Sequence, residues 1–306
     1  KHQSRGLSIE RLVISLYAKG MSVADIESEM QEIYGINLST SAISIITNKV
    51  SQAASEWQNR PLESLYMIVW MDGIVFKVRE NGKVINKTVY LCVGLNKEGL
   101  KEVLGMWVGK NESAAFWMGV LTDLKARGVE DILITVTDNL NGFTETIKSV
   151  FPTSTTQICV VHQIRNSCRY VVWKEKKEFT SDLKNIYNAP TKEAAKMELE
   201  NFEQKWGTKY PYAIRSWRNN WEELTVFFDF PVEIRKIIYT TNLIENLNGK
   251  IRKYTKNKLS FPNDDALKKS VYLAITEIEK KWYQPIWNWA LIFNQFITIF
   301  ENRIQV

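Results

Sequence analysis

Hydrophobic positions along the chain change their spacing twice. From residues 8 to 50 the apolar residues recur at helical intervals, in segments that stop at Gly20 and Gly35. From 65 to 162 they form short continuous runs or alternate with polar residues, which is typical of strands. From about 163 to 235 the sequence is charged and helical in pattern. We therefore expect a helical N-terminal region, an α/β body, and an all-helical segment that interrupts this body.

The N-terminal pattern predicts three short helices. Ser22 is a candidate N-cap of the second helix, and a hydroxyl-rich segment begins the third. The break at Gly20 resembles a helix-turn-helix, in which the third helix would enter a DNA groove. A plain three-helix packing unit fits the same pattern. In the DNA-binding interpretation, the candidate contact residues are Ser39, Thr40, Ser41, Ser44 and Lys49.

The α/β body is predicted by the order of its apolar runs. The expected elements are strands at 65–72, 84–95 and 101–109, a helix at 112–128, a strand at 131–138, a helix at about 142–151 and a strand at 155–162. Two of these strands, the ones that end at Asp72 and Asp138, are apolar throughout, as expected for strands buried on both faces. The order predicts a mixed five-stranded sheet with helices.

Asp72 and Asp138 stand in equivalent places, each at the end of a buried strand. If the two strands are parallel neighbours, both carboxylates lie at the rim where α/β sheets place their sites. Two carboxylates that close repel each other, and a divalent cation relieves the repulsion. The alternative is that both are ordinary aspartates of strand-terminal turns.

A third carboxylate stands alone in a basic segment. Glu245 is the only acidic residue between Ile234 and Asn263. It lies on a predicted helix whose apolar residues share another face. Glu245 is either a surface ion-pair partner or a residue that meets a phosphate through a metal ion. The basic residues that follow it are candidates for phosphate contacts or form an ordinary solvated face. They are Lys250, Arg252, Lys253, Lys256 and Lys258.

Composition narrows the classes of protein. The chain has 306 residues, 45% of them hydrophobic, which belongs to a globular protein. Lys and Arg number 40 against 34 Asp and Glu, a net charge of +6 that permits a polyanionic partner. Three cysteines are too few for a disulfide framework and suit a reducing cytoplasm. Neither a run of about twenty apolar residues nor a signal peptide occurs, so we expect no membrane association.

Five motifs occur in a fixed order. Asp72 lies in "WMDGI" and Asp138 in "VTDNLNGF"; "QICVVHQIRN" follows at 157–166, "SWRNNW" at 216–221, and "IRKIIYTTNLIENLNGKIRK" at 234–253. Over nearly the whole chain this ordered set closely resembles the Mutator family of bacterial insertion-sequence transposases. The resemblance implies a DDE transposase of the α/β class with an RNase H-like sheet.

The resemblance also implies a division of the chain into domains. The boundaries that we expect are a helix-turn-helix DNA-binding region at 1–62, a first catalytic part at 63–164, an all-α insertion at 165–235, a second catalytic part with the Glu245 helix at 236–281, and a C-terminal helical tail at 282–306. The tail is apolar enough to pack on the body or on a partner chain.

Carried onto this sequence, the resemblance makes Asp72, Asp138 and Glu245 the catalytic and metal-binding triad. Two Mg²⁺ ions, for which Mn²⁺ may substitute, would serve a reaction that cuts the element ends and joins the 3′-OH to target DNA. The implied partners are double-stranded DNA, as terminal inverted repeats and as target, and a second copy of the chain, because two ends must be brought together. The implied location is the bacterial cytoplasm.

Three further features carry alternatives. Cys159 and His162 form a family motif, yet Cys-x-x-His is only half of a zinc site, so we expect packing and hydrogen bonding near the active centre. His162, Arg165 and Asn166 are candidate DNA contacts. Trp217 either packs in a core or stacks on an unpaired base. For the whole chain, the alternatives to a transposase are a nuclease that only hydrolyses and a non-catalytic DNA-binding protein.

Overall fold

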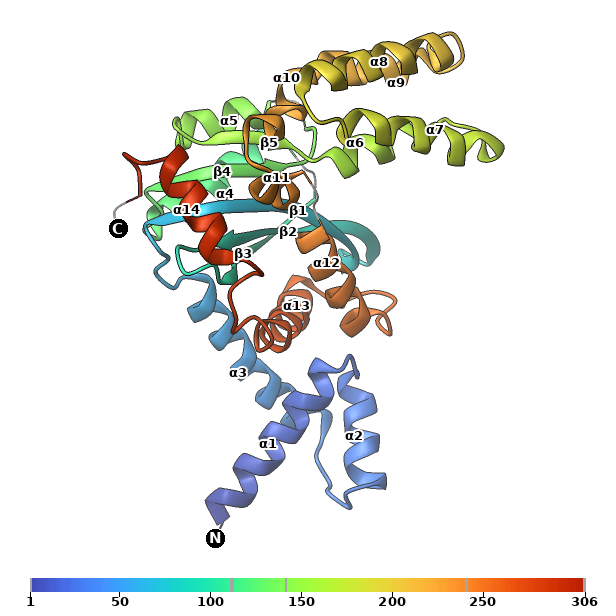
Figure 1. Ribbon diagram of the computed structural model, residues 1–306. Coiled ribbons are helices and arrows are strands. Elements are labelled where there is room, and N and C mark those ends of the chain that lie inside the picture. The colour runs from blue at the N-terminus through green and yellow to red at the C-terminus, as the bar shows by residue number, and fades with distance from the viewer. Residues whose placement is uncertain (1, 111–112, 141, 240–241, 305–306) are drawn as a thin grey trace.

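A five-stranded mixed sheet forms the centre of the molecule, with helices on both faces (Figure 1). The computed structural model describes residues 2–110, 113–140, 142–239 and 242–304. The strands are β1 (Leu65–Glu80), β2 (Lys83–Leu95), β3 (Lys101–Gly109), β4 (Asp131–Thr137) and β5 (Thr155–Ile158). Their order is β3-β2-β1-β4-β5, with β1, β4 and β5 parallel and the remaining pairs antiparallel. The mixed five-stranded sheet predicted from the sequence is confirmed.

The first strand is longer than expected. β1 does not end at Asp72 but continues to Glu80, where Asn81 and Gly82, both with positive φ, turn the chain into β2. The first half of β1 is buried on both faces, whereas the second half alternates buried and exposed residues. The sequence predicted an end at Asp72 because the continuous apolar run ends there. A half-buried hairpin strand has a weaker hydrophobic pattern, so its residues were not recognised as part of the strand.

The last strand is shorter than expected. β5 ends at Ile158, and the residues predicted to continue it to 162 belong instead to helix α6 (Val160–Ser167). Cys159 is the N-cap of this helix, and its sulfur accepts a hydrogen bond from the His162 backbone N–H at 3.3 Å. β5 is an edge strand that pairs with β4 alone, so the apolar residues after it are buried by a helix rather than by a neighbouring strand.

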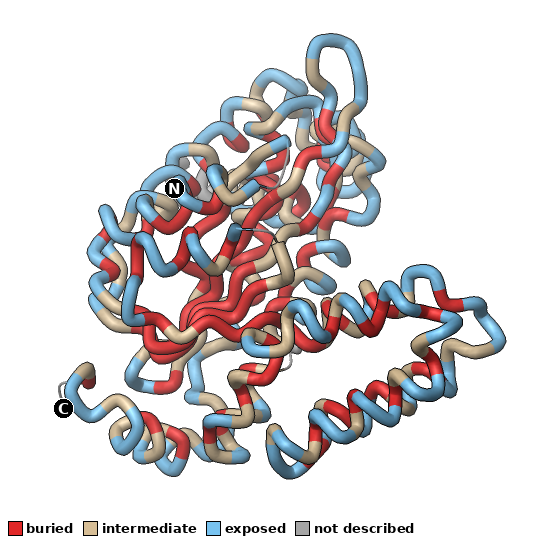
Figure 2. Tube along the Cα trace, turned by 90° about the horizontal axis from the view of Figure 1, so that it is seen from above, coloured by how far each residue is buried: buried red, intermediate tan, exposed pale blue. Residues whose placement is uncertain are grey.

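Helices cover the two faces of the sheet with separate apolar layers. α4 (Ala114–Ala126) and α5 (Phe143–Val150) bury Trp117 and Phe143 against one face. The other face is covered by α11 (Val232–Ile238), α12 (Asn242–Thr255), α13 (Asp264–Glu279) and α14 (Trp289–Ile299). Figure 2 shows the buried residues concentrated in the strands between these layers. Among the described residues, no helix combines the length and the apolar character needed to cross a bilayer.

The N-terminal region consists of the three helices that were predicted. They are α1 (His2–Ala18), α2 (Val23–Glu32) and α3 (Thr40–Gln58). Ser22 forms a capping box with Asp25 at the start of α2, and Ser39 caps α3. The three helices share an apolar cluster with Leu273 of α13, so α13 joins this region to the sheet.

A helical arm extends from the sheet between β5 and α11 (Figure 1). Its helices are α7 (Trp173–Tyr187), α8 (Lys192–Trp206) and α9 (Pro211–Asn219), followed by the short α10 (Trp221–Leu224) and a 3-10 turn at Val226–Asp229. The rings of Phe179, Trp206 and Tyr210 pack against one another within the arm. The helical segment predicted to interrupt the α/β body is therefore confirmed as helical.

The C-terminal tail packs on the body of the same chain. The Trp289 indole N–H donates to the Lys97 carbonyl oxygen at 3.0 Å, and its ring lies directly against Gly99. Arg303 forms a two-pronged ion pair with Asp131, at 2.8 and 2.7 Å. These contacts tie α14 and the residues after it to the end of the sheet where β4 begins, opposite the carboxyl end of that strand.

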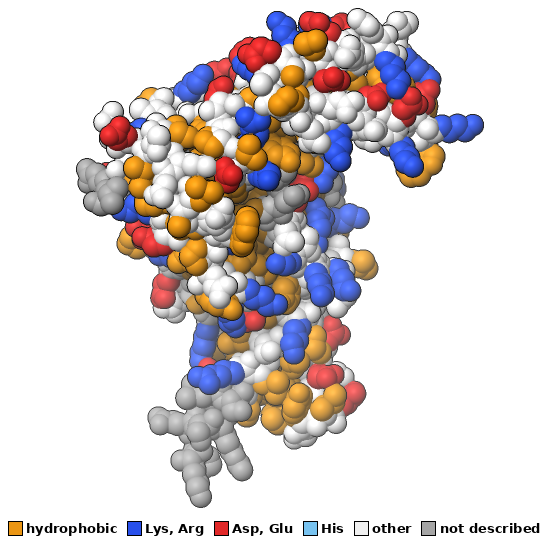
Figure 3. All heavy atoms as spheres, in the orientation of Figure 1, with side chains coloured by type: hydrophobic (Ala, Val, Ile, Leu, Met, Phe, Trp, Pro, Cys, Tyr) orange, Lys and Arg blue, Asp and Glu red, His pale blue; other side chains and the backbone are white. Residues whose placement is uncertain are grey.

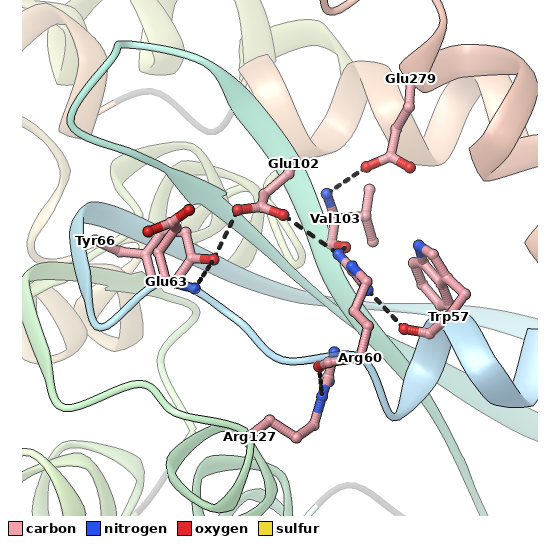
Figure 4. A network of polar contacts seen from close by, with 8 residues as sticks. All are labelled: Trp57, Arg60, Glu63, Tyr66, Glu102, Val103, Arg127 and Glu279. Carbon is pink, nitrogen blue, oxygen red and sulfur yellow. Dashed lines mark hydrogen bonds and ion pairs between the residues drawn. The ribbon is translucent and has the colours of Figure 1, made fainter.

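A polar network joins α3, β3 and α13 (Figure 4). Arg60 donates to the carbonyl oxygens of Trp57 and Val103 at 2.8 and 2.7 Å and pairs with Glu102 at 3.3 Å. Glu279 of α13 accepts the Val103 backbone N–H at 2.7 Å. Val103 lies at the bulge in the pairing of β2 with β3, where an N–H is free for a side chain.

Glu279 makes the stability of the protein depend on pH. Burial raises the pKa of this carboxyl group above its ordinary value. The folded state therefore favours the protonated form, and this stabilisation is lost as pH rises from the unfolded-state pKa through the folded-state pKa. We expect Glu279→Gln to melt at a higher temperature than the wild type at pH 7, with the difference narrowing towards pH 4. Thermal melts across this range test the expectation, and a less stable variant at pH 7 would contradict it.

Candidate active site

The two aspartates belong to neighbouring strands: β1 contains Asp72, and Asp138 directly follows β4. The strands are parallel, and Trp70 is the partner of Val136. Asp72 lies two positions beyond this pair on β1, and Asp138 directly follows the last residue of β4. Side chains two positions apart on a strand lie on the same face of a sheet, so Asp72 shares the face of Trp70. The prediction that their strands are parallel neighbours is confirmed. Asp72 does not end β1 as predicted; it lies just beyond the last residue of β1 that pairs with β4.

Helix α12 carries the third carboxylate to the same face. Ile244, Leu247 and Ile251 are fully buried in the apolar cluster that also contains Trp70. This buried stripe turns the polar side of α12, with Glu245, along the sheet. Asn248, one turn after Glu245, donates its side-chain N–H to Oδ2 of Asp72 at 2.6 Å. The helix of Glu245 is thus hydrogen-bonded directly to the strand of Asp72.

Asn248 was not among the candidates taken from the sequence. The sequence did contain an indication of its role, because a residue three positions after Glu245 lies on the same side of a helix. Its side-chain Oδ1 is buried and, within the part of the chain described, has no hydrogen-bond partner. The amide therefore ties the helix of Glu245 to Asp72 and keeps one oxygen of its own without a hydrogen bond among the described residues.

The carboxylates are held by groups of the chain itself. Asp72 Oδ1 accepts the Gly73 backbone N–H at 2.8 Å. Glu245 Oε1 lies 2.7 Å from Nη1 of Arg165, on α6, as an ion pair, yet this buried oxygen makes no well-aligned hydrogen bond. Among the residues that the structure describes, no group of three or more His, Cys, Asp and Glu side chains is gathered closely enough to hold a metal ion.

The Cys-x-x-His motif has a structural role. Cys159 is fully buried and caps α6, as described above. His162 is half-buried, and its Nδ1 has no hydrogen-bond partner among the described residues. The expectation of packing and hydrogen bonding is confirmed for Cys159. The cap also orients α6, the helix that presents Arg165 to Glu245.

Trp217 has no face available for a base. Only 1% of it is exposed, and its indole N–H donates to Ser167 at 2.9 Å. The base-stacking alternative is therefore wrong for this residue, and the packing alternative is right. Its position on a helix could not distinguish core packing from base stacking, because both roles are compatible with the same spacing of tryptophans along the sequence.

The basic residues after Glu245 divide into two kinds. Four of them, Lys250, Arg252, Lys253 and Lys256, are exposed. Figure 3 shows Lys and Arg side chains gathered over α12, below the arm. Lys258 instead turns inward: its Nζ lies 3.0 Å from Ser270 Oγ and 4.1 Å from the centre of the Tyr17 ring. Burial, together with Lys269, lowers the pKa of Lys258 to about 8. Its prediction as one of a row of phosphate contacts does not fit this position.

The other predicted DNA contacts are partly engaged within the protein. Lys49 pairs with Glu10 at 2.6 Å, and Asn166 Oδ1 accepts the Tyr212 hydroxyl at 2.5 Å. Ser39 is used as a helix cap, and Ser44 is half-buried. The three predicted contacts at the start of α3 are exposed. They are Ser39, Thr40 and Ser41.

Comparison with known proteins identifies the family of the chain. Residues 1–285 match the family model described as "Transposase, Mutator family". The chain is 43% identical, over 99% of its length and 76% of the relative's, to a probable transposase for insertion sequence element ISRM3-like of Sinorhizobium fredii. Identity is 39% over 92% of this chain and 82% of the relative for a probable insertion-sequence transposase of Corynebacterium diphtheriae. The chain belongs to the Mutator family of transposases, and the resemblance seen in its motifs is confirmed.

Proposed function

We propose that this chain is a DDE transposase that cuts the ends of its insertion sequence and joins the freed 3′-OH to target DNA by metal-dependent phosphoryl transfer. The observation that carries the proposal is the 2.6 Å hydrogen bond from Asn248 to Asp72. It fixes the Glu245 helix against the strand whose register also brings in Asp138. In the proposed site, these three carboxylates from distant parts of the sequence act together at this face of the sheet.

The donor set fits a hard divalent cation. Asp72, Asp138 and Glu245 offer only oxygen atoms, which suit Mg²⁺ or Mn²⁺ rather than zinc. The buried Oε1 of Glu245 and Oδ1 of Asn248 have unused capacity to accept a cation or a hydrogen bond. Asp72, Asp138 and Glu245 would hold two such ions, which would supply activation of the attacking water or 3′-hydroxyl and stabilisation of the leaving oxygen. The chain supplies the ligands and, from exposed Lys and Arg residues of α12, the positive charge that holds the DNA backbone.

The remaining parts of the fold have roles within this proposal. The sheet serves as an RNase H-like catalytic domain in two parts, 63–164 and 236–281, interrupted by the insertion at 165–235. The region 1–62 acts as a helix-turn-helix that recognises the terminal inverted repeats, with the exposed start of α3 nearest the DNA. A homodimer holds two ends together. The confirmed family and the observed order of strands and helices support these assignments.

A strand-transfer assay tests the proposal. The protein is incubated with a labelled duplex carrying the element end and with a target plasmid, in Mg²⁺, Mn²⁺ or EDTA. We expect joined product that depends on the metal ion. Nicked ends without joined product would indicate a nuclease that only hydrolyses, and binding without cleavage would indicate a non-catalytic DNA-binding protein.

The two kinds of lysine after Glu245 predict different effects on DNA binding. Lys253→Gln removes an exposed charge and should lower the affinity for the end duplex, with the slope of log K against log salt falling by about 0.9. Lys258→Gln should leave this slope unchanged, because its ammonium group is turned towards Ser270. Fluorescence anisotropy titrations at several salt concentrations measure both. Equal losses of slope in the two variants would contradict the distinction.

A further inference from the structure

Glu245 is neutralised by a group that has no place in a metal-binding triad. Arg165 Nη1 lies 2.7 Å from Glu245 Oε1, with 59% of the arginine side chain and 23% of the glutamate side chain exposed. Arg165 belongs to α6, which begins directly after β5, the strand beside β4. A positive charge from the edge of the sheet therefore reaches the carboxylate that α12 supplies.

The geometry of this ion pair marks it as replaceable. A guanidinium and a carboxylate in their preferred arrangement form two parallel hydrogen bonds. Here Oε1 of Glu245 is buried and makes no aligned hydrogen bond, although the charges are close. Exposed ion pairs of this kind are weak. Arg165 thus balances the charge of Glu245 without satisfying its oxygen.

Asp72, like Glu245, is contacted by a donor group of the protein. Asp72 Oδ2 accepts the amide N–H of Asn248, which also leaves its own Oδ1 unpaired. Asp72 and Glu245 are therefore each held in place by a donor of the chain. A divalent cation that uses Oε1 of Glu245 would lie close to the positive guanidinium, which is 2.7 Å from the same oxygen. Repulsion between the two positive charges favours displacement of the guanidinium.

We propose that Arg165 is an internal counter-ion of Glu245: it holds this carboxylate in place until a divalent cation displaces it, and the released guanidinium then contacts a DNA phosphate at the site. The inference rests on the proposed function. Arg165 is a positioning residue for Glu245, and its planar fork suits a phosphate once it is free. The exposure of its side chain and the basic surface of α12 place it where DNA would lie.

Metal binding by the full chain without DNA is the first test. Mn²⁺ binding is measured by electron paramagnetic resonance, which reports free Mn²⁺ and requires no catalysis. We expect Arg165→Gln to bind Mn²⁺ about 3- to 5-fold more tightly than the wild type, the scale of a partly exposed ion pair. Arg169→Gln is the matched control, because it removes the same charge four residues further on, where the guanidinium lies over Tyr170.

The outcomes separate the inference from the proposed function. Unchanged or weaker Mn²⁺ binding in Arg165→Gln, or equal tightening in Arg169→Gln, would overturn the counter-ion role. The variant Asp72→Asn is measured alongside. If it binds Mn²⁺ as the wild type does, the metal site itself is misplaced and the inference falls with it.

DNA binding gives a second and independent readout. In EDTA, Arg165 is engaged with Glu245, so Arg165→Gln should leave the affinity for the end duplex within about 2-fold of the wild type, whereas with Ca²⁺ it should weaken binding about 3- to 5-fold. Glu245→Gln frees the guanidinium and should tighten binding in EDTA. An effect of Arg165→Gln that is the same in Ca²⁺ and in EDTA would show that the guanidinium is not released by the metal.

Discussion

Replacing Asp72 or Asp138 by Asn, or Glu245 by Gln, should lower end cleavage and strand transfer by about 1000-fold or more, while none of these changes weakens end binding by more than about 2-fold. Each amide keeps the shape of the side chain and removes the charge that a divalent cation requires. The hydrogen bond from Asn248 to Asp72 ties the helix of Glu245 to β1, and β1 pairs in parallel with β4, which Asp138 directly follows. In the proposed site the three carboxylates act as one unit. Loss of any one carboxylate should therefore remove the same activity.

Single-turnover assays with labelled ends and anisotropy with the same duplex measure the two quantities. Glu130→Gln is the matched control: this exposed carboxylate precedes β4 at the opposite end of the strand from Asp138. It should retain activity within about 2-fold, as expected for a surface substitution. A triad variant that cleaves at the wild-type rate would have no part in the chemistry, whatever the other two show.

Gln157→Leu should lower the free energy of unfolding by about 2–5 kcal/mol, the cost of leaving two or more buried polar groups without partners. Gln157 is fully buried at the end of β5. Its amide N–H donates to the carbonyl oxygens of Ile158 and Leu224 at 2.6 and 2.9 Å, and its oxygen accepts the Phe227 N–H at 2.7 Å. Leucine fills a similar volume but pairs with none of these groups.

The effect should be strongest where the helical arm returns to the sheet, because Leu224 and Phe227 are the contacts that anchor this return. Urea denaturation measures the stability, and limited proteolysis shows whether the segment around 220–235 becomes cleavable first. Gln204→Leu, the same change at an exposed position of α8, should alter stability by less than about 0.5 kcal/mol. A loss of less than 1 kcal/mol in Gln157→Leu would mean that water or a neighbouring group satisfies the exposed backbone.

Sequence patterns predicted most elements but misjudged their ends where a single residue changed role. Asp72 marks the end of an apolar run but not of its strand, because the hairpin beyond it buries only one face. Cys159 continues the apolar pattern of β5, yet its sulfur caps a helix. In both cases the local pattern was real, and the segment that follows directly in sequence decided its meaning: β2 pairs with the second half of β1, and α6 begins after Cys159.

By itself the sequence determined the class of fold and the order of its elements and singled out three candidate carboxylates, because apolar periodicity and isolated acidic residues are local properties. Only the tertiary structure decided which side chains meet. It buried Trp217, turned Lys258 towards Ser270, linked Asn248 to Asp72 and set Arg165 against Glu245. These contacts join residues brought together by the packing of α6 and α12 on the sheet. They depend on side-chain direction and distance in three dimensions, which spacing along a chain does not contain.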